Sequence, residues 1–253
     1  MMNKRFKLIG NFIATAIVLL APMAHADDSP HQFSANVAIS TDYRFRGVSQ
    51  TARDPAISGG FDYSYTPMGF YAGTWASNLD FAVPDPDVAA MELDLYAGFN
   101  GTFPNTGVGW DVGGLYYAYP GSNTGTGVAD YAYWEAYGSL SYDFSMFSVT
   151  GGLNYSPDYF FESGDAQYLY GDVSVPLPVG ELTLAGHVGH QWVDNNSQLG
   201  LPDYTDWKIG VSRDVGPFNF DVSYIDTDVG KSQCFGGSDF CQATAVFTIS
   251  SSF

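Results

Sequence analysis

Charged side chains in this chain recur at alternate positions of long stretches that are apolar at the positions between them. Successive residues of an extended strand project to opposite faces, so each stretch has one polar and one apolar face. Charges gathered on one face attract or repel ions, and no bond-making chemistry is needed. The residues predicted to line the polar faces are Asp42, Arg44, Arg46, Asp62, Glu92, Asp94, Glu135, Asp143, Asp172, Asp206, Lys208 and Asp221.

Carboxylates far outnumber bases in this set, which predicts a preference for cations. Arg44 and Arg46 lie two positions apart, and we expect them to form a basic ladder against Asp62 or another acid. Opposed acidic and basic walls create a field across a constriction. The alternative is a closed interior in which these charges are paired and bulky tyrosines fill the space. Those tyrosines are Tyr96, Tyr133, Tyr137, Tyr168 and Tyr170.

Catalytic and metal chemistry find little support in the residues. His187 and His190 are three positions apart and therefore lie on opposite faces of a strand, which favours isolated polar or interfacial roles. There is no Gly-x-Ser-x-Gly motif, and a lipid-acting enzyme built on His190 would need a serine on a neighbouring strand. Pro84-Asp85-Pro86-Asp87 is acidic but lacks a calcium-binding pattern, so a solvated loop is favoured. We expect no catalytic residue, metal or cofactor.

Cys234 and Cys241 are the only cysteines, seven positions apart. Neither has a second cysteine or a histidine close by in the sequence, so a metal site is disfavoured. An exported chain permits disulfides, and the glycines between the two cysteines allow a tight reversal. We predict one disulfide that staples the last external loop.

The alternating stretches are the elements that must position these side chains, and they number twelve. They cover Phe33–Arg46, Ala56–Tyr65, Phe70–Phe81, Met91–Asn100, Val108–Tyr119, Tyr131–Phe144, Phe147–Tyr155, Gln167–Leu177, Glu181–Trp192, Tyr204–Asp214, Phe218–Tyr224 and Gln242–Phe253. Short and long connections alternate between them. An even number of strands with short periplasmic turns and longer external loops is typical of an outer-membrane barrel. We therefore predict a single closed antiparallel transmembrane β-barrel of about twelve strands.

The five tryptophans, Trp75, Trp110, Trp134, Trp192 and Trp207, are predicted to face outward in the girdles at the membrane interfaces. The third stretch in particular is predicted to turn Tyr71 and Trp75 toward lipid.

The chain ends carry targeting information. Residues 1–26 combine a basic start, an apolar stretch and a small-x-small site at Ala24-His25-Ala26, which indicates a cleaved signal peptide. Residues 27–253 then form the barrel domain. The terminal Phe253 resembles the signal read by the outer-membrane insertion machinery, which is one expected partner. A formal net charge of −18 excludes nucleic-acid binding through a basic surface.

One stretch resembles a known family. Asn36-Val37-Ala38 followed by Thr41-Asp42-Tyr43-Arg44-Phe45-Arg46-Gly47-Val48-Ser49-Gln50 is similar to the opening of the TorF-type putative porins. Further matching pieces are Asp54-Pro55-Ala56, Gly59-Gly60-Phe61-Asp62-Tyr63, Gly69–Asn78 and Glu92–Gly98. The likeness covers about the first 70 residues after the signal segment and implies an outer-membrane pore. It implies no substrate and no catalytic residues.

Together these patterns predict a channel in the outer membrane of a Gram-negative bacterium, passing small hydrophilic solutes by diffusion and preferring cations. Its surroundings would be outer-membrane lipid and lipopolysaccharide. Two alternatives remain open. One is a structural or adhesive barrel with a closed lumen, and the weaker one is an outer-membrane enzyme that acts on lipid.

Overall fold

The computed structural model describes residues 29–81, 89–122 and 130–253. Twelve antiparallel strands close into one barrel in which each strand pairs with its neighbours in the chain, and β1 closes against β14. The strands are β1 (His31–Ser40), β4 (Ala56–Tyr65), β5 (Phe70–Asn78), β6 (Met91–Thr102), β7 (Gly109–Ala118), β8 (Tyr133–Asp143), β9 (Ser148–Ser156), β10 (Ala166–Pro176), β11 (Leu182–Val193), β12 (Tyr204–Val215), β13 (Phe218–Thr227) and β14 (Thr244–Ser252). The predicted closed barrel of about twelve strands is confirmed.

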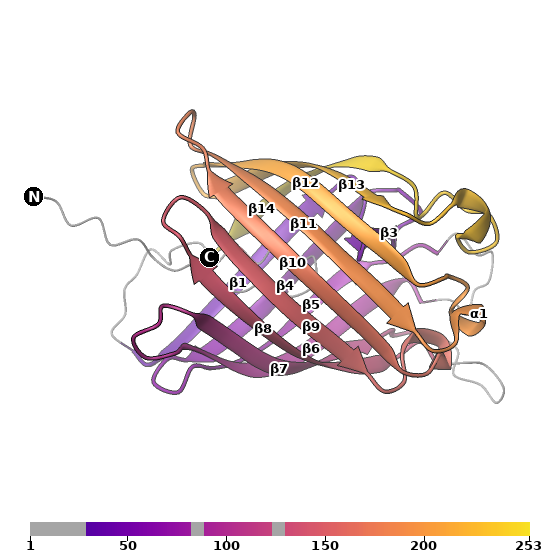
Figure 1. Ribbon diagram of the computed structural model, residues 1–253, viewed down its shortest axis with the longest axis horizontal. Coiled ribbons are helices and arrows are strands. Elements are labelled where there is room, and N and C mark those ends of the chain that lie inside the picture. The colour runs from indigo at the N-terminus through magenta and orange to yellow at the C-terminus, as the bar shows by residue number, and fades with distance from the viewer. Residues whose placement is uncertain (1–28, 82–88, 123–129) are drawn as a thin grey trace, which may run out of the picture.

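Both ends of the barrel wall, the start of β1 and the end of β14, lie at the end that carries the tight turns, which we call the terminal end (Figure 1). The opposite, loop end carries the longer connections with α1 (Asn196–Leu199) and the short 3-10 helices Phe160–Glu162 and Lys231–Gln233. No helix among the described residues has the length and apolar composition needed to cross a membrane. The predicted signal segment, residues 1–26, and the acidic stretch Pro84–Asp87 lie outside the described residues.

Alternation of side chains gives the barrel an apolar outer face and a polar inner face. On β8 the exposed fraction is 50% for Trp134 and 1% for Glu135. Phe61 on β4, Leu95 on β6 and Leu169 on β10 are likewise exposed on the outside. The prediction is wrong for β5, where Tyr71 and Trp75 are buried on the inner face and small residues face outward. Trp75 packs there against the ring of Tyr43, so an aromatic inside the lumen has a partner that local periodicity does not reveal.

The first strand is shorter than the alternation predicts. β1 ends at Ser40, and the next residue, Thr41, donates its N–H to the carbonyl of Phe247 on β14 over 3.0 Å. The chain then forms a small separate hairpin, β2 (Arg44–Phe45) and β3 (Val48–Ser49), before β4 begins at Ala56. The alternation of side chains continues from β1 into the hairpin, because a hairpin arm alternates just as a wall strand does.

Candidate functional site: the barrel lumen

The β2–β3 hairpin folds into the barrel and carries Arg46 at its tip. Arg46 and Gly47 form the turn with φ values of 47° and 80°, the left-handed geometry of two-residue hairpin loops. A Cβ at position 47 would lie 2.6 Å from Cγ2 of Thr227 and 2.7 Å from Cβ of Asp206, so the close approach requires glycine. The tip of the hairpin therefore presses against the inner face of β12 and β13, which are three and two strands away from β1 around the barrel.

Arg46 is held by groups on two wall strands. Its Nη2 donates to both oxygens of Glu135 on β8, over 2.8 and 2.7 Å, and its Nη1 donates to Oε1 of Gln191 on β11 over 2.6 Å. All three side chains are about 1% exposed. Asn154 Nδ2 and Tyr117 Oη donate to the same Glu135 carboxylate over 2.9 and 3.3 Å.

Aromatic rings complete the surroundings of the guanidinium. Its central carbon lies 4.3 Å from the centre of the Tyr168 ring, 4.6 Å from that of Phe45 and 5.9 Å from that of Tyr159. These separations are those of cation–π contacts. Burial disfavours the charged guanidinium, but the Glu135 carboxylate outweighs this and holds the pKa of Arg46 well above its usual value. Arg46 therefore stays positively charged inside the barrel.

Asp42 organises the base of the hairpin. Its carboxylate accepts from Arg44 Nε over 2.6 Å, and from the hydroxyls of Ser49 and Thr51 over 2.7 and 3.2 Å. Arg44 is 3% exposed, so this network is shielded from solvent. Farther along, the hydroxyl of Tyr43 donates to Glu92 on β6 over 2.8 Å. The hairpin thus spans the lumen from the β1 side to β6, β8 and β11.

The loop between β13 and β14 clamps the hairpin from the loop end. Cys234 and Cys241 are joined by a disulfide in that loop, as predicted, and both are fully buried. Arg44 Nη1 donates to the carbonyls of Phe240 and Gln242 over 2.7 and 3.2 Å, and the N–H of Ser49 donates to Phe240 over 3.0 Å. The disulfide therefore shapes the segment that holds the hairpin, in addition to stapling the loop.

Replacing Cys234 and Cys241 together with serine is expected to loosen the hairpin and leave the barrel intact. Closing so short a loop contributes about 2–3 kcal/mol in the chain-entropy account. The sheet itself does not depend on these side chains, so the circular dichroism signal of the strands should be unchanged. Single-channel recording should show more frequent current fluctuations than for the parent. Equal fluctuations in both proteins would contradict this role of the loop.

Carboxylates dominate the inner face of β4–β8. Asp62 accepts a hydrogen bond from Tyr96 Oη, and Asp111 accepts one from Tyr71 Oη over 2.6 Å. Asp94 is 8% exposed, and its Oδ1 has no hydrogen-bond partner among the described residues. These strands contain no lysine or arginine, so this side of the lumen gathers carboxyl groups without a base of its own.

His187 lies in a polar cluster on the opposite wall, which corrects the expectation of an isolated residue. Its Nδ1 is 2.7 Å from Asp172, and its Nε2 is 3.3 Å from Asp206. Tyr168 Oη contacts Nε2 of His187 over 2.8 Å and donates to Asp206 over 2.8 Å. The strand register brings these residues together, since Asp172 is opposite His187 and His187 is opposite Lys208. His190 has a separate environment, with Thr205 at 2.8 Å and Trp192 against its ring.

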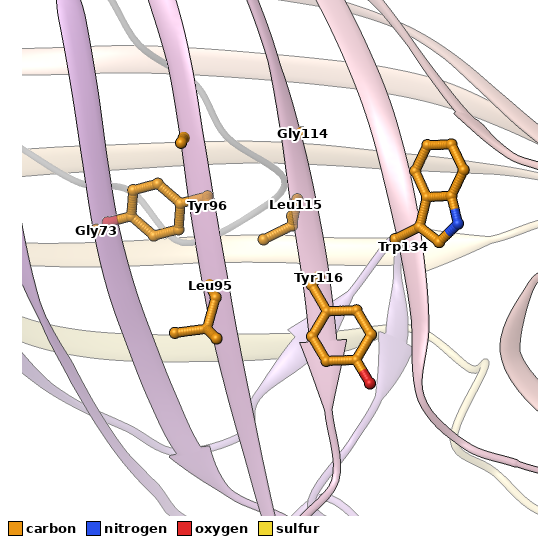
Figure 2. Close-up of a pocket in the computed structure, with 8 residues that line it drawn as sticks. Gly73, Leu95, Tyr96, Gly114, Leu115, Tyr116 and Trp134 are labelled. Carbon is orange, nitrogen blue, oxygen red and sulfur yellow. The ribbon is translucent and has the colours of Figure 1, made fainter.

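Several tyrosines of the lumen lie flat on glycines of the neighbouring strand. Tyrosines that closed the lumen would instead project toward its centre. The ring of Tyr96 lies across Gly73, its register partner on β5, as Figure 2 shows. Tyr170 lies over Gly152 in the same way. A Cβ added at either glycine would lie 2.5 Å from the tyrosine ring. Tyr96 and Tyr170 therefore lie against the wall, because missing side chains on the neighbouring strands make room for their rings there.

Replacing Gly152 with alanine is expected to push the Tyr170 ring off the wall. Overpacking of this kind costs about 1–3 kcal/mol, so the barrel should unfold at a lower temperature. Gly151→Ala is the matched control, because its Cβ would meet nothing nearer than the Tyr170 carbonyl at 3.8 Å. Thermal unfolding in detergent, followed by circular dichroism, compares the two. Equal unfolding temperatures for the two variants would show that the position of the Tyr170 ring does not require a glycine at position 152.

The remaining predicted lumen residues are placed as follows. Asp172, Asp206, Lys208 and Asp221 project from β10, β12 and β13, where Asp221 accepts from Ser223 Oγ over 2.6 Å. Asp143 is exposed at the end of β8, and its carboxylate accepts from the N–H of Ser145 over 2.7 Å. Asp143 thus caps a turn, because its own side-chain oxygen satisfies the turn backbone. Arg44 and Arg46 lie on the hairpin and form no ladder on the β1 wall.

Sequence reasoning missed Gln191, Asn154 and Tyr159, which surround the Arg46–Glu135 pair. Gln191 and Asn154 fall on inner faces by alternation, but they are uncharged, so the pattern of charges does not single them out. Tyr159 comes from the connection between β9 and β10, where no periodicity applies. Among the described residues, no group of three or more His, Cys, Asp or Glu side chains is arranged to hold a metal ion.

Comparison with known proteins gives a family and a fold. The model of a family described as "Bacterial protein of unknown function (Gcw_chp)" matches residues 24–253. Among solved structures, the NanC porin is 13% identical, with a TM-score of 0.51 over 88% of this chain and 99% of that chain. LpxR from Salmonella typhimurium is 9% identical, with a TM-score of 0.47 over 87% of this chain and 99% of that chain. Curated proteins give no match. The likeness to the NanC porin supports the barrel fold alone, and the TorF-type resemblance stays a prediction.

Proposed function

This chain belongs to the bacterial Gcw_chp family, and we propose that it is an outer-membrane channel through which small hydrophilic solutes diffuse, with a preference for cations. The observation that carries the proposal is the acidic inner face of a closed barrel whose outer face is apolar. Glu92, Asp94 and Glu135 lie on β6 and β8, and the hairpin supplies Arg46 as the counter-charge of Glu135. Such a lining concentrates cations and repels anions.

The proposed orientation places the terminal end in the periplasm and the loop end outside the cell. The exposed aliphatic and aromatic side chains of the outer face would contact outer-membrane lipid, with lipopolysaccharide at the loop end. Phe253 is 70% exposed at the end of the last strand, accessible to the insertion machinery during assembly.

The test is the reversal potential of the purified protein in a planar bilayer with a salt gradient. We expect discrete conductance steps and a reversal potential of the sign that indicates cation preference. The preference should weaken at 1 M salt, where the screening length falls to about 3 Å. An anion-selective channel would contradict the assignment of the lumen.

A closed structural or adhesive barrel is the second candidate, because the hairpin crosses the lumen and contacts wall strands on opposite sides. The same recording separates the two functions. Complete absence of conductance, both in the parent and in variants with a weakened hairpin, would favour the closed barrel. The lipid-acting enzyme has no comparable observation in its favour.

A further inference from the structure

The pocket that receives Arg46 has the composition of a guanidinium receptor. We define the Arg46 pocket as Glu135, Asn154, Tyr159, Tyr168 and Gln191. Glu135 offers two oxygens to one guanidinium nitrogen, and Gln191 offers an amide oxygen to the second. Tyr168 presents a ring within 4.3 Å of the guanidinium carbon. A planar cation that carries several N–H donors suits this set of oxygens and ring faces better than a compact ammonium ion does.

The pocket belongs to the barrel and not to the hairpin. Glu135, Asn154, Tyr168 and Gln191 stand on β8, β9, β10 and β11, and Tyr159 on the connection that follows β9. These strands pair along nearly their whole length, so their inner face keeps its arrangement when the hairpin moves. Without Arg46, the buried Glu135 carboxylate would keep its donors Asn154 and Tyr117 but lose its counter-charge. A buried carboxylate without a counter-charge attracts a replacement cation.

The bound Arg46 is an imperfect occupant. Its Nε is buried and has no hydrogen-bond partner among the described residues. The hairpin backbone also holds Arg46 itself at a positive φ of 47°, which is unfavourable for a side chain other than glycine. A free guanidinium group avoids the backbone cost, because it is not tied to the hairpin.

We propose that the Arg46 pocket binds guanidinium-bearing organic cations that enter the lumen, and that Arg46 is their built-in competitor. Occupation by a solute leaves Arg46 without its partners and releases the hairpin from the far wall. The pocket is then a selective station on the permeation path, and in this respect the inference rests on the proposed channel function. Binding itself needs only the folded barrel.

The experiment uses methylguanidinium as the probe and methylammonium as its matched control, with full-length Arg46→Ala protein in planar bilayers. We expect methylguanidinium to block the current in a saturable way. Block by methylammonium should need about a tenfold higher concentration, because its single nitrogen cannot serve the Glu135 carboxylate and the Gln191 amide oxygen as the two guanidinium nitrogens do. The double variant Arg46→Ala/Glu135→Gln should lose the preference for methylguanidinium. Equal block by both cations, or block that ignores Glu135, would overturn the proposal.

A second readout separates the receptor from the channel. Thermal unfolding of the Arg46→Ala protein in detergent should shift upward with millimolar methylguanidinium and stay unchanged with methylammonium. The shift without conductance would retain the receptor and reject the channel function. Conductance without the shift or selective block would reject the receptor and retain the channel. If Arg46→Ala fails to fold, Arg46→Lys serves for both readouts, because lysine keeps a charge in the pocket and makes a weaker competitor.

Discussion

Replacing Arg46 with alanine is expected to raise the mean conductance of the barrel strongly. Removing one partner of a buried ion pair costs about 3–5 kcal/mol, because the other charge is left unpaired. That loss falls on the conformation in which the hairpin crosses the lumen, since only this conformation contains the pair. Each ~1.4 kcal/mol changes an equilibrium constant tenfold. The population of the conformation in which the hairpin crosses the lumen should therefore fall by a factor of about 100 or more relative to the other conformations. Single-channel recording should show longer open times and larger steps.

Arg213→Ala is the control for this prediction. Arg213 is half exposed near the terminal end of β12, and its ion pair with Glu181 spans 4.0 Å in solvent. Exposed pairs of this kind contribute about 0–1 kcal/mol, so the control should conduct like the parent. Parent-like recordings for Arg46→Ala would show that the Arg46–Glu135 pair does not hold the hairpin in the lumen.

Neutralising Glu92 and Asp94 together, as Glu92→Gln/Asp94→Asn, is expected to reduce cation preference. Both carboxylates are buried on β6 in the lumen, and Oδ1 of Asp94 has no partner among the described residues. The double change removes two carboxyl groups from one wall and keeps the size of the side chains. In the Arg46→Ala background, where we expect the lumen to be open, the reversal potential at low salt should move toward zero.

Asp143→Asn is the matched control, because this acid is exposed in a turn at the terminal end. It removes one carboxyl group at the terminal end of the barrel and should leave the reversal potential nearly unchanged. Thermal stability provides a second check, since a buried carboxylate oxygen without a partner carries a desolvation cost. The Glu92→Gln/Asp94→Asn barrel should therefore unfold at no lower a temperature than its parent. An unchanged reversal potential in the double variant would place the selective region elsewhere.

The hairpin changes what the charges of the first stretch can do. On a wall strand, Arg44 and Arg46 would tune selectivity by their charge alone. On the hairpin, Arg44 holds the base to the disulfide loop and Arg46 holds the tip to the opposite wall. The two arginines, adjacent in the pattern, therefore act at different ends of one hairpin. This division predicts that their single variants differ in conductance more than in ion preference.

Much of the architecture follows from the sequence by itself. Alternation of polar and apolar residues is a local property of each strand, and it requires two different surroundings for the two faces. It predicted twelve strands, the alternation of short and long connections and the outward face of β8. The cysteine spacing likewise predicted the disulfide, because only two cysteines were available to pair.

The tertiary structure decided where the first stretch leaves the wall and what fills the lumen. A hairpin arm and a wall strand share the same period of two, so the positions beyond Ser40 look identical in either role. The inward orientation of the Trp75 side chain on β5 depends on its contact with Tyr43. The position of the Tyr96 ring against the wall depends on Gly73 of the neighbouring strand. The pairing of Arg46 with Glu135, 89 positions away, depends on the closure of the whole barrel. Contacts of this kind follow from register and closure, which no local pattern of residues encodes.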